Sequence, residues 1–408
     1  MNVLKKKDPY QVYILICFLS QLFFTFIFTV NLLYQVQIVK LDPFQLVIVG
    51  SVLEAVVFLF EIPTGVVSDM KSRKLSIIIG YFLIGIGFFL EGSLPYFSTV
   101  MLCQIFWGIG YTFTSGSVQA WIADEIGEER ASLAFVRGAK AGNLGKIIAI
   151  PLSIVTGYEV ISLPIMTGGI CMIGLSIFLI YFMKEEKFKP TTKRVSTWKT
   201  MKGNLSAIFY FSKANYFMRI LFLIALFFGL YSEGFDRLWI SHFFEVTHLS
   251  SLPEGKLVVV TGGIEFIVVL ASFAILHLIG HIPIHQHLKH IYLALLIGSL
   301  LIIASLIGFA LSTQIISLLV FYIIIQVTRY AMYPLEDVWL NKIIPDSSNR
   351  ATFFSVKGQV DAIGQICGGP VIGLIASNFT IKIAMMVSAL LLTPVLFLYS
   401  MILKKLKG

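Results

Sequence analysis

Long apolar stretches separated by short polar segments run along the whole chain. An α-helix needs about 20 mostly apolar residues to cross the hydrocarbon core of a bilayer, and twelve stretches meet this need. The pattern therefore predicts an all-α membrane protein with twelve transmembrane helices. The first six are expected at 11–38, 46–68, 75–93, 98–123, 132–156 and 161–183. The other six are expected at 215–244, 257–280, 290–311, 315–341, 351–376 and 380–403.

One longer polar segment, residues 184–214, divides the twelve stretches six and six. We therefore expect an N-terminal six-helix bundle (1–183), a central loop (184–214) and a C-terminal six-helix bundle (215–408). The loop mixes lysines with aromatic residues, which suits either an interfacial helix or a solvated linker.

The two halves share an ordered series of residues, which indicates a parallel duplication. The series is Trp121, Arg130, Gly138, Gly145 and Pro151 in the first half and Trp339, Arg350, Gly358, Gly364 and Pro370 in the second.

Composition agrees with a protein whose solvent is lipid. Hydrophobic residues make up 57% of the chain and charged residues 13%, whereas soluble domains are about 45–50% apolar and about 25% charged. The net charge of +9 comes from Lys and Arg that gather in alternate loops and in both termini. Cytoplasmic loops of membrane proteins collect such residues, so both termini and the central loop are expected in the cytoplasm. The basic charge therefore implies no nucleic-acid partner.

Catalytic and cofactor signatures are not found in the sequence. There is no G-x-x-x-x-G-K-[ST] motif, and the four cysteines form no C-x-x-C. We expect neither an enzyme nor a bound cofactor. A histidine cluster allows either a metal site or a partly charged loop beside the membrane, and the loop is favoured because no carboxylate or cysteine is near. Its members are His277, His281, His285, His287 and His290.

The strongest local motif is the segment from Gly65 to Lys74, in the tight loop after the second expected helix. Asp69 can pair with an arginine or cap the next helix, and such a charge-assisted contact can hold one conformation. The segment resembles the loop signature of the major facilitator superfamily, G-x-L-A-D-R-x-G-R-K. Asp69, Arg73 and Lys74 match that signature, while Met70 and Ser72 depart from it.

This resemblance extends over essentially the whole chain and implies the major facilitator fold of two six-helix bundles. It implies a secondary transporter of the bacterial cytoplasmic (inner) membrane, expected as a monomer. The substrate of such a transporter is a small molecule bound near the midplane, and the bundles rock for alternating access.

A second resemblance is to drug:proton antiporters of the tetracycline- or macrolide-efflux type. Their G-P-x-x-G motif has a counterpart in the second half instead of its usual fifth helix. Helix packing explains the same residues equally simply. They are Gly364, Gly368, Gly369, Pro370 and Gly373.

Several charged residues lie inside the expected helices, where they are costly unless they face a cavity or a partner. Glu61, Glu265 and Asp361 are candidate proton carriers, because a carboxylate removed from water takes up a proton more readily. Arg329 is expected to neutralise one of them or to hold an anionic substrate. Further candidates are Glu233, Asp236 and Arg237, and Lys146 and Lys357 are further basic residues inside the expected helices. The alternative for each is a static buried pair that fixes helix register.

The first functional hypothesis is proton-driven export of small lipophilic compounds such as antibiotics. The second keeps the fold and changes the cargo to a metabolite, peptide or siderophore. The third, from another class, is a membrane sensor or assembly factor that transports nothing. Susceptibility to unrelated drugs separates the first from the second, and tolerance of changes at the buried carboxylates would indicate the third.

Overall fold

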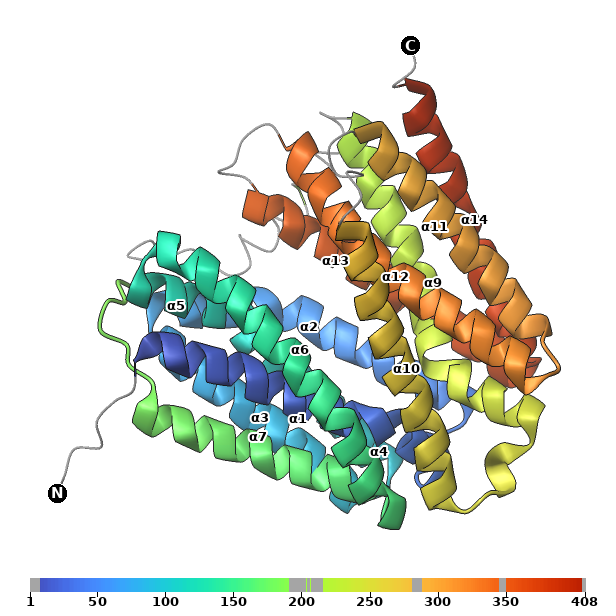
Figure 1. Cartoon of the computed structure of the whole chain (residues 1–408), viewed down its shortest axis with the longest axis horizontal. Coiled ribbons are helices and arrows are strands. Elements are labelled where there is room, and N and C mark those ends of the chain that lie inside the picture. Colours follow the sequence, from blue (N-terminus) through green and yellow to red (C-terminus); the bar gives the residue numbers. More distant parts are fainter. Residues whose placement is uncertain are drawn as a thin grey trace. The chain divides into compact units, whose positions relative to one another are not determined.

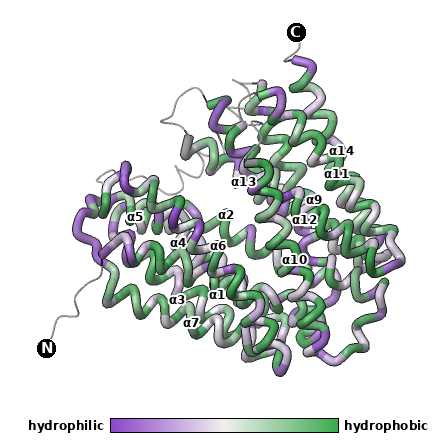
Figure 2. The backbone as a smooth tube through the Cα atoms, in the orientation of Figure 1, coloured by the Kyte–Doolittle hydropathy of each residue, from purple (hydrophilic) through white to green (hydrophobic). Residues whose placement is uncertain are grey.

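The computed structural model describes residues 8–190, 203, 206, 216–280, 288–344 and 350–405. All regular elements in these ranges are helical (Figure 1). Most of the expected central loop, together with His281, His285 and His287, lies outside the described residues. Figure 2 shows that most of each long helix is hydrophobic, whereas hydrophilic residues gather in the loops beside α5.

Helices of the first half follow the expected stretches with one exception. Their bounds are α1 Pro9–Gln37, α2 Pro43–Met70, α3 Arg73–Ser93, α4 Phe97–Thr114, α5 Ser117–Ile126, α6 Glu128–Glu159 and α7 Ser162–Phe182. The stretch expected as one helix at 98–123 is broken between α4 and α5. Gly116 has a φ of +70° there, a backbone conformation that glycine adopts without steric cost.

Helices of the second half match the expected six one for one. Their bounds are α9 Tyr216–Thr247, α10 Glu254–Gly280, α11 Leu288–Leu311, α12 Ile315–Ile343, α13 Arg350–Asn378 and α14 Ile381–Lys405, with a short 3₁₀ turn η1 at Leu249–Ser251. Among the described residues, ten helices of the chain are long and apolar enough to cross a membrane. Two of the twelve expected transmembrane helices are not among these ten. One corresponds to α4 with its continuation α5, and the other to α6, which contains several charged residues.

The order of helix pairing is the same in the two halves. In the first half α1 packs against α6 and α7, and α3 packs against α4 and α7. In the second half α9 packs against α13 and α14, and α11 packs against α12 and α14. Each helix of the first half thus packs against the same neighbours as the helix at the equivalent position of the second half. This agreement is expected of a duplicated chain.

One glycine contact repeats at atomic detail. A Cβ added to Gly145 of α6 would collide with the backbone oxygen of Phe18 in α1. A Cβ added to Gly364 of α13 would collide in the same way with the backbone oxygen of Leu226 in α9. The absence of a side chain at these two positions lets each helix pair approach closely.

Contacts divide the chain into two compact units. The first unit consists of Met1–Lys40, Val52–Thr200 and Leu252–Gly263. The second unit consists of Leu41–Ser51, Met201–Ser251 and Ile264–Gly408. The division differs from the expected halves in that the start of α2 groups with the second unit and the start of α10 with the first.

Candidate functional site

A polar cavity of about 310 Å³ lies within the second unit, between α9, α12 and α13. Its lining residues recur at intervals of three and four along each helix, so they share one face. On α13, for example, Lys357, Asp361 and Gln365 are spaced four residues apart. The charged lining consists of Asp236, Arg329, Glu336, Lys357 and Asp361. Three carboxylates and two cations therefore meet in one space inside a hydrophobic bundle.

Arg329 is bound to Asp236 in this cavity. Nη1 and Nη2 of the guanidinium donate to Oδ1 and Oδ2 of the carboxylate at 2.5 and 2.8 Å. The ring of Tyr231 lies beneath the guanidinium, with its centroid 5.9 Å from Cζ. The direct partner of Arg329 among the described residues is thus Asp236 and not Glu61, Glu265 or Asp361, and the alternative that Arg329 holds an anionic substrate stays a prediction. The bidentate geometry that an arginine prefers is supplied by an aspartate on α9.

Asp361 has a different environment from the other two carboxylates. Nζ of Lys357 donates to Oε2 of Glu336 at 2.7 Å, so this lysine has its own partner. The carboxylate of Asp361 accepts a hydrogen bond from the neutral amide of Gln365 at 2.7 Å. Within the described ranges it forms no ion pair with Arg329 or Lys357. Asp361 is thus the cavity carboxylate that has no cation bound directly to it.

Two other predicted acids of the second unit lie outside this cavity. Glu233 is buried and pairs with Arg237 at 3.3 Å. This pair faces the start of α2, where a Cβ added to Gly50 would collide with both side chains. Glu265 of α10 accepts a 2.7 Å hydrogen bond from the hydroxyl of Tyr322. In this conformation Glu233 is thus bound within α9, and Glu265 is bound to a tyrosine of α12.

Glu61 belongs to the first unit, on the later part of α2. It is not among the described residues that line the cavity of Asp361. The sequence criterion of a charge inside an expected helix selects residues in several separate places.

The loop motif after α2 forms a small ionic network. Arg73, at the start of α3, donates from Nη1 to Asp69 at 2.9 Å and from Nε to Asp124 at 2.5 Å. Asp124 lies near the end of α5, so the arginine joins three helices of the first unit. Lys74 donates to the backbone oxygens of Ile180 and Met183 at the end of α7.

The glycine-rich part of α13 faces two neighbours. Gly364 and Gly368 lie against the backbone of α9. Gly369 and Gly373 lie against the beginning of α2, near Ser51 and Phe44. Pro370 sits inside the helix, which continues past it. In this conformation the motif serves helix packing, and its expected relation to antiporters stays a prediction.

Family membership follows from the sequence match over most of the chain. Residues 13–327 match the model of the Major Facilitator Superfamily. The chain belongs to the Major Facilitator Superfamily. As a member it is a multi-pass membrane transporter and not an enzyme, and the all-α, twelve-helix prediction is confirmed.

Similar proteins share this architecture along nearly their full length. The uncharacterized MFS-type transporter YxaM of Bacillus subtilis (strain 168) is 26% identical over 377 residues, which cover 88% of each chain. The crystal structure of the nucleoside transporter NupG aligns with a TM-score of 0.76 at 16% identity, over 98% of this chain and 100% of the other. A bacterial homologue of the human lysosomal transporter Spinster, inward-facing and occupied, aligns with a TM-score of 0.74 at 14% identity, over 97% of each chain. At these identities the structures show the fold.

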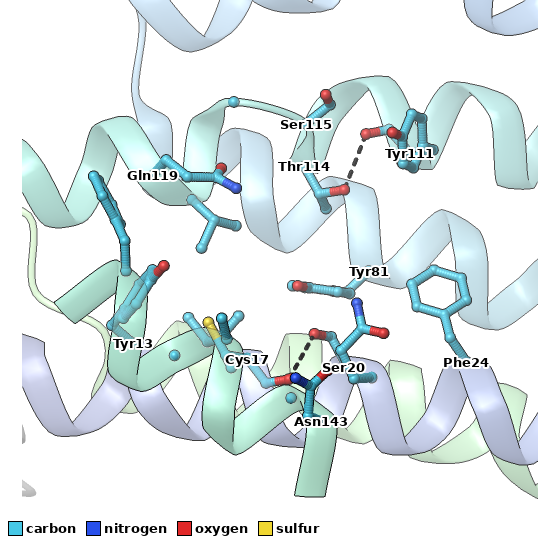
Figure 3. Close-up of a pocket in the computed structure, with 18 of the residues that line it drawn as sticks. Tyr13, Cys17, Ser20, Phe24, Tyr81, Tyr111, Thr114, Ser115, Gln119 and Asn143 are labelled. Carbon is cyan, nitrogen blue, oxygen red and sulfur yellow. Dashed lines mark hydrogen bonds between the residues drawn. The ribbon is translucent and has the colours of Figure 1, made fainter. Parts of the chain in front are cut away.

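The first unit of this superfamily member contains a second cavity, of about 540 Å³. It lies between α1, α3, α4, α5 and α6, at the point where α4 and α5 are broken. Figure 3 shows the rings of Tyr13, Phe24 and Tyr81 and the amides of Gln119 and Asn143 around it. Lys146 of α6 also lines this cavity.

A buried carboxylate in the first unit was missed by sequence reasoning. Glu91 of α3 is fully buried. Its Oε1 accepts hydrogen bonds from Asn31 at 2.8 Å and from Gln35 at 2.9 Å, both on α1. Glu91 lies at the end of the expected stretch 75–93, where a charge is ordinary, so its depth was not apparent.

The partners of the predicted charges were also missed. Asp124 and Glu336 lie near the ends of expected helices, where charged residues are ordinary, so the sequence did not single them out. Asp124 accepts from Arg73, and Glu336 accepts from Lys357. A helical period places residues on one face, but it does not say which other helix that face meets.

Proposed function

We propose that this transporter couples proton movement to the export of small lipophilic compounds, with Asp361 as the carboxylate that takes up and releases the proton. It would work as a monomer in the cytoplasmic membrane of a bacterium, with both termini in the cytoplasm. The observation that carries the proposal is the charge arrangement in the cavity of the second unit. Two of its carboxylates are bound to cations, and the third, Asp361, is bound to a neutral amide.

A carboxylate that carries protons must exist in both protonation states at modest free-energy cost. A directly bound cation opposes protonation, an amide donor opposes it far less, and a low-dielectric surrounding favours it. Asp361 meets this condition better than Asp236 or Glu336. Arg329 and Lys357 then keep the other two carboxylates charged, so that protonation changes at one place.

The cavity also has an apolar wall, which supports a lipophilic cargo. Phe228, Tyr231, Tyr333 and Phe354 line it together with Met332. Ligand cavities combine such aromatic surface with a few polar groups that fix orientation. The export direction and the breadth of cargo rest on the resemblance to drug:proton antiporters.

Drug susceptibility of an efflux-deficient bacterium tests the proposal. Cells that express the wild type should resist several unrelated antibiotics or dyes, and a protonophore should abolish that resistance. Asp361→Asn, which keeps size and removes the titratable group, should abolish it too, while Asp361→Glu should retain part of it. Glu245→Gln changes an exposed carboxylate of α9 and serves as the matched control.

Two results would overturn the proposal. One is full resistance in Asp361→Asn cells at equal membrane abundance, which removes Asp361 as the proton carrier. The other is wild-type cells with no resistance to any compound but a changed response to one metabolite. That outcome would support a dedicated metabolite transporter instead.

A further inference from the structure

The cavity of the first unit contains one formal charge. Lys146 is the only acidic or basic side chain, tyrosine and cysteine aside, among the described residues that line it. It lies near the middle of α6, far from both helix ends. A lysine at such a depth is costly unless it faces water or an anion.

No described residue supplies that anion. Among the described residues, none forms a hydrogen bond or an ion pair with the ammonium of Lys146. The polar groups around it are neutral hydroxyls and amides, among them Gln21, Gln119 and Asn143. The contrast with the second unit is clear, because there both cations have carboxylate partners.

The internal repeat explains why the lysine has no partner. Gly145 and Gly364 make the same contact in their two units, so the residues that follow them, Lys146 and Gln365, occupy equivalent positions. Gln365 donates to Asp361, four residues before it. The residue four before Lys146 is Gly142, which has no side chain. At these equivalent positions one unit has an amide bound to a carboxylate, and the other has a cation that no described residue pairs with.

We propose that this cavity binds a lipophilic organic anion, whose negative group pairs with Lys146 and whose apolar body lies against the aromatic rings of Tyr13, Phe24 and Tyr81. The proposal rests on the proposed transport function and narrows its cargo to organic acids. A volume of about 540 Å³ falls in the range of cavities that hold small organic ligands. Lysine binds anions as a point charge, so a carboxylate of varied orientation is accommodated.

Binding to the purified full-length transporter in detergent tests this directly, without a proton gradient. The probes are 1-naphthoate, 4-phenylbutyrate and indole-3-acetate, each compared with its own neutral amide. The rise in Tm on adding ligand and the Kd from calorimetric titration are measured. At least one acid should bind and raise the Tm, and its amide should bind about tenfold more weakly or worse, because a charge-assisted contact is lost.

Three variants locate the charge that is responsible. Lys146→Gln should weaken acid binding about tenfold or more and leave amide binding unchanged. Lys146→Arg should retain most of the affinity. Lys140→Gln removes an exposed lysine from the same helix and should change nothing.

The proposal is overturned if none of the three acids binds, if every amide binds as well as its acid, or if Lys146→Gln keeps wild-type affinity. The acid–amide comparison uses wild-type protein, so it remains decisive even if a variant does not fold. Asp361→Asn separates this proposal from the transport proposal. If Asp361→Asn still binds the acid and its efflux is unchanged, Asp361 is rejected as the proton carrier and the anion site is kept. If Lys146→Gln shows unchanged proton-coupled efflux, the anion site is rejected as the site of the cargo and proton coupling is kept.

Discussion

The guanidinium of Arg329 binds both carboxylate oxygens of Asp236, and this contact joins α12 to α9 inside the second unit. Removal of one member leaves the other charged, partly buried and unpaired, which is more costly than the absence of both. We expect Arg329→Gln or Asp236→Asn alone to lower the unfolding free energy by about 1–3 kcal/mol. The double variant should lose less than the sum of the two. Thermal unfolding in detergent measures this double-mutant cycle, and strict additivity would show that the pair contributes no coupling.

The loop network of the first unit predicts unequal effects of its two aspartates. Asp69 is 55% exposed and lies four residues from Arg73 on neighbouring helix ends, whereas Asp124 is 34% exposed and reaches Arg73 from another helix. Exposed ion pairs contribute only about 0.2–1 kcal/mol. We therefore expect Asp124→Asn to slow transport more than Asp69→Asn, with both proteins at normal abundance in the membrane. Transport rates in proteoliposomes measure the difference. Wild-type rates for both variants would exclude a role for this network in holding one conformation.

The close contact between α13 and α9 predicts a steric effect that is specific to one glycine. Gly364→Ala places a methyl group against the backbone of α9, which cannot yield as a flexible side chain can. The expected loss of stability is about 1–3 kcal/mol, as for overpacked cores. Gly358→Ala is the matched control, because an added Cβ on this residue of α13 would meet no atom within 4 Å. The Tm of the two purified variants decides the point, and equal values would contradict it.

The buried carboxylate of Glu91 predicts a contrast between two substitutions. A single oxygen, Oε1, accepts from both Asn31 and Gln35, and Glu91→Gln retains an oxygen that can do the same. Glu91→Leu removes this acceptor, so Asn31 and Gln35 each lose one buried hydrogen bond, at about 1–3 kcal/mol each, while Gln35 keeps its bond to Oδ1 of Asn31. We expect a small change in Tm for the first variant and a large fall for the second. Similar losses in both would mean that the negative charge itself is what stabilises α1 against α3.

Hydrophobic patterning was sufficient to locate the helices, because each expected stretch is long enough to cross a bilayer. It was not sufficient for the break between α4 and α5. That break depends on the backbone conformation of Gly116, and the surrounding residues remain apolar enough to look continuous. The ordered series of tryptophan, glycine and proline predicted the repeat, and two of its members, Gly145 and Gly364, mark a close helix contact that both halves retain.

The sequence identified the charged residues of the candidate site, but it did not predict which of them form ion pairs with one another. Asp236, Arg329 and Asp361 were selected because they are charged residues inside apolar stretches, and the structure brings all three to one cavity. The same criterion selected Glu233 and Glu265, which lie in other contacts. Which charge meets which depends on the rotation of each helix about its axis and on its neighbours, and a single sequence fixes neither.

The repeated contact of Gly145 with Phe18 and of Gly364 with Leu226 involves backbone atoms of the partner helix. Such a contact does not depend on the chemistry of the adjacent side chains. After a gene duplication, neighbouring positions are therefore free to diverge while the scaffold is inherited unchanged. Lys146 and Gln365 are one such divergence. In this way the two halves of one chain can keep the same helix packing while they carry different side chains, a lysine in one half and a glutamine in the other, at an equivalent position.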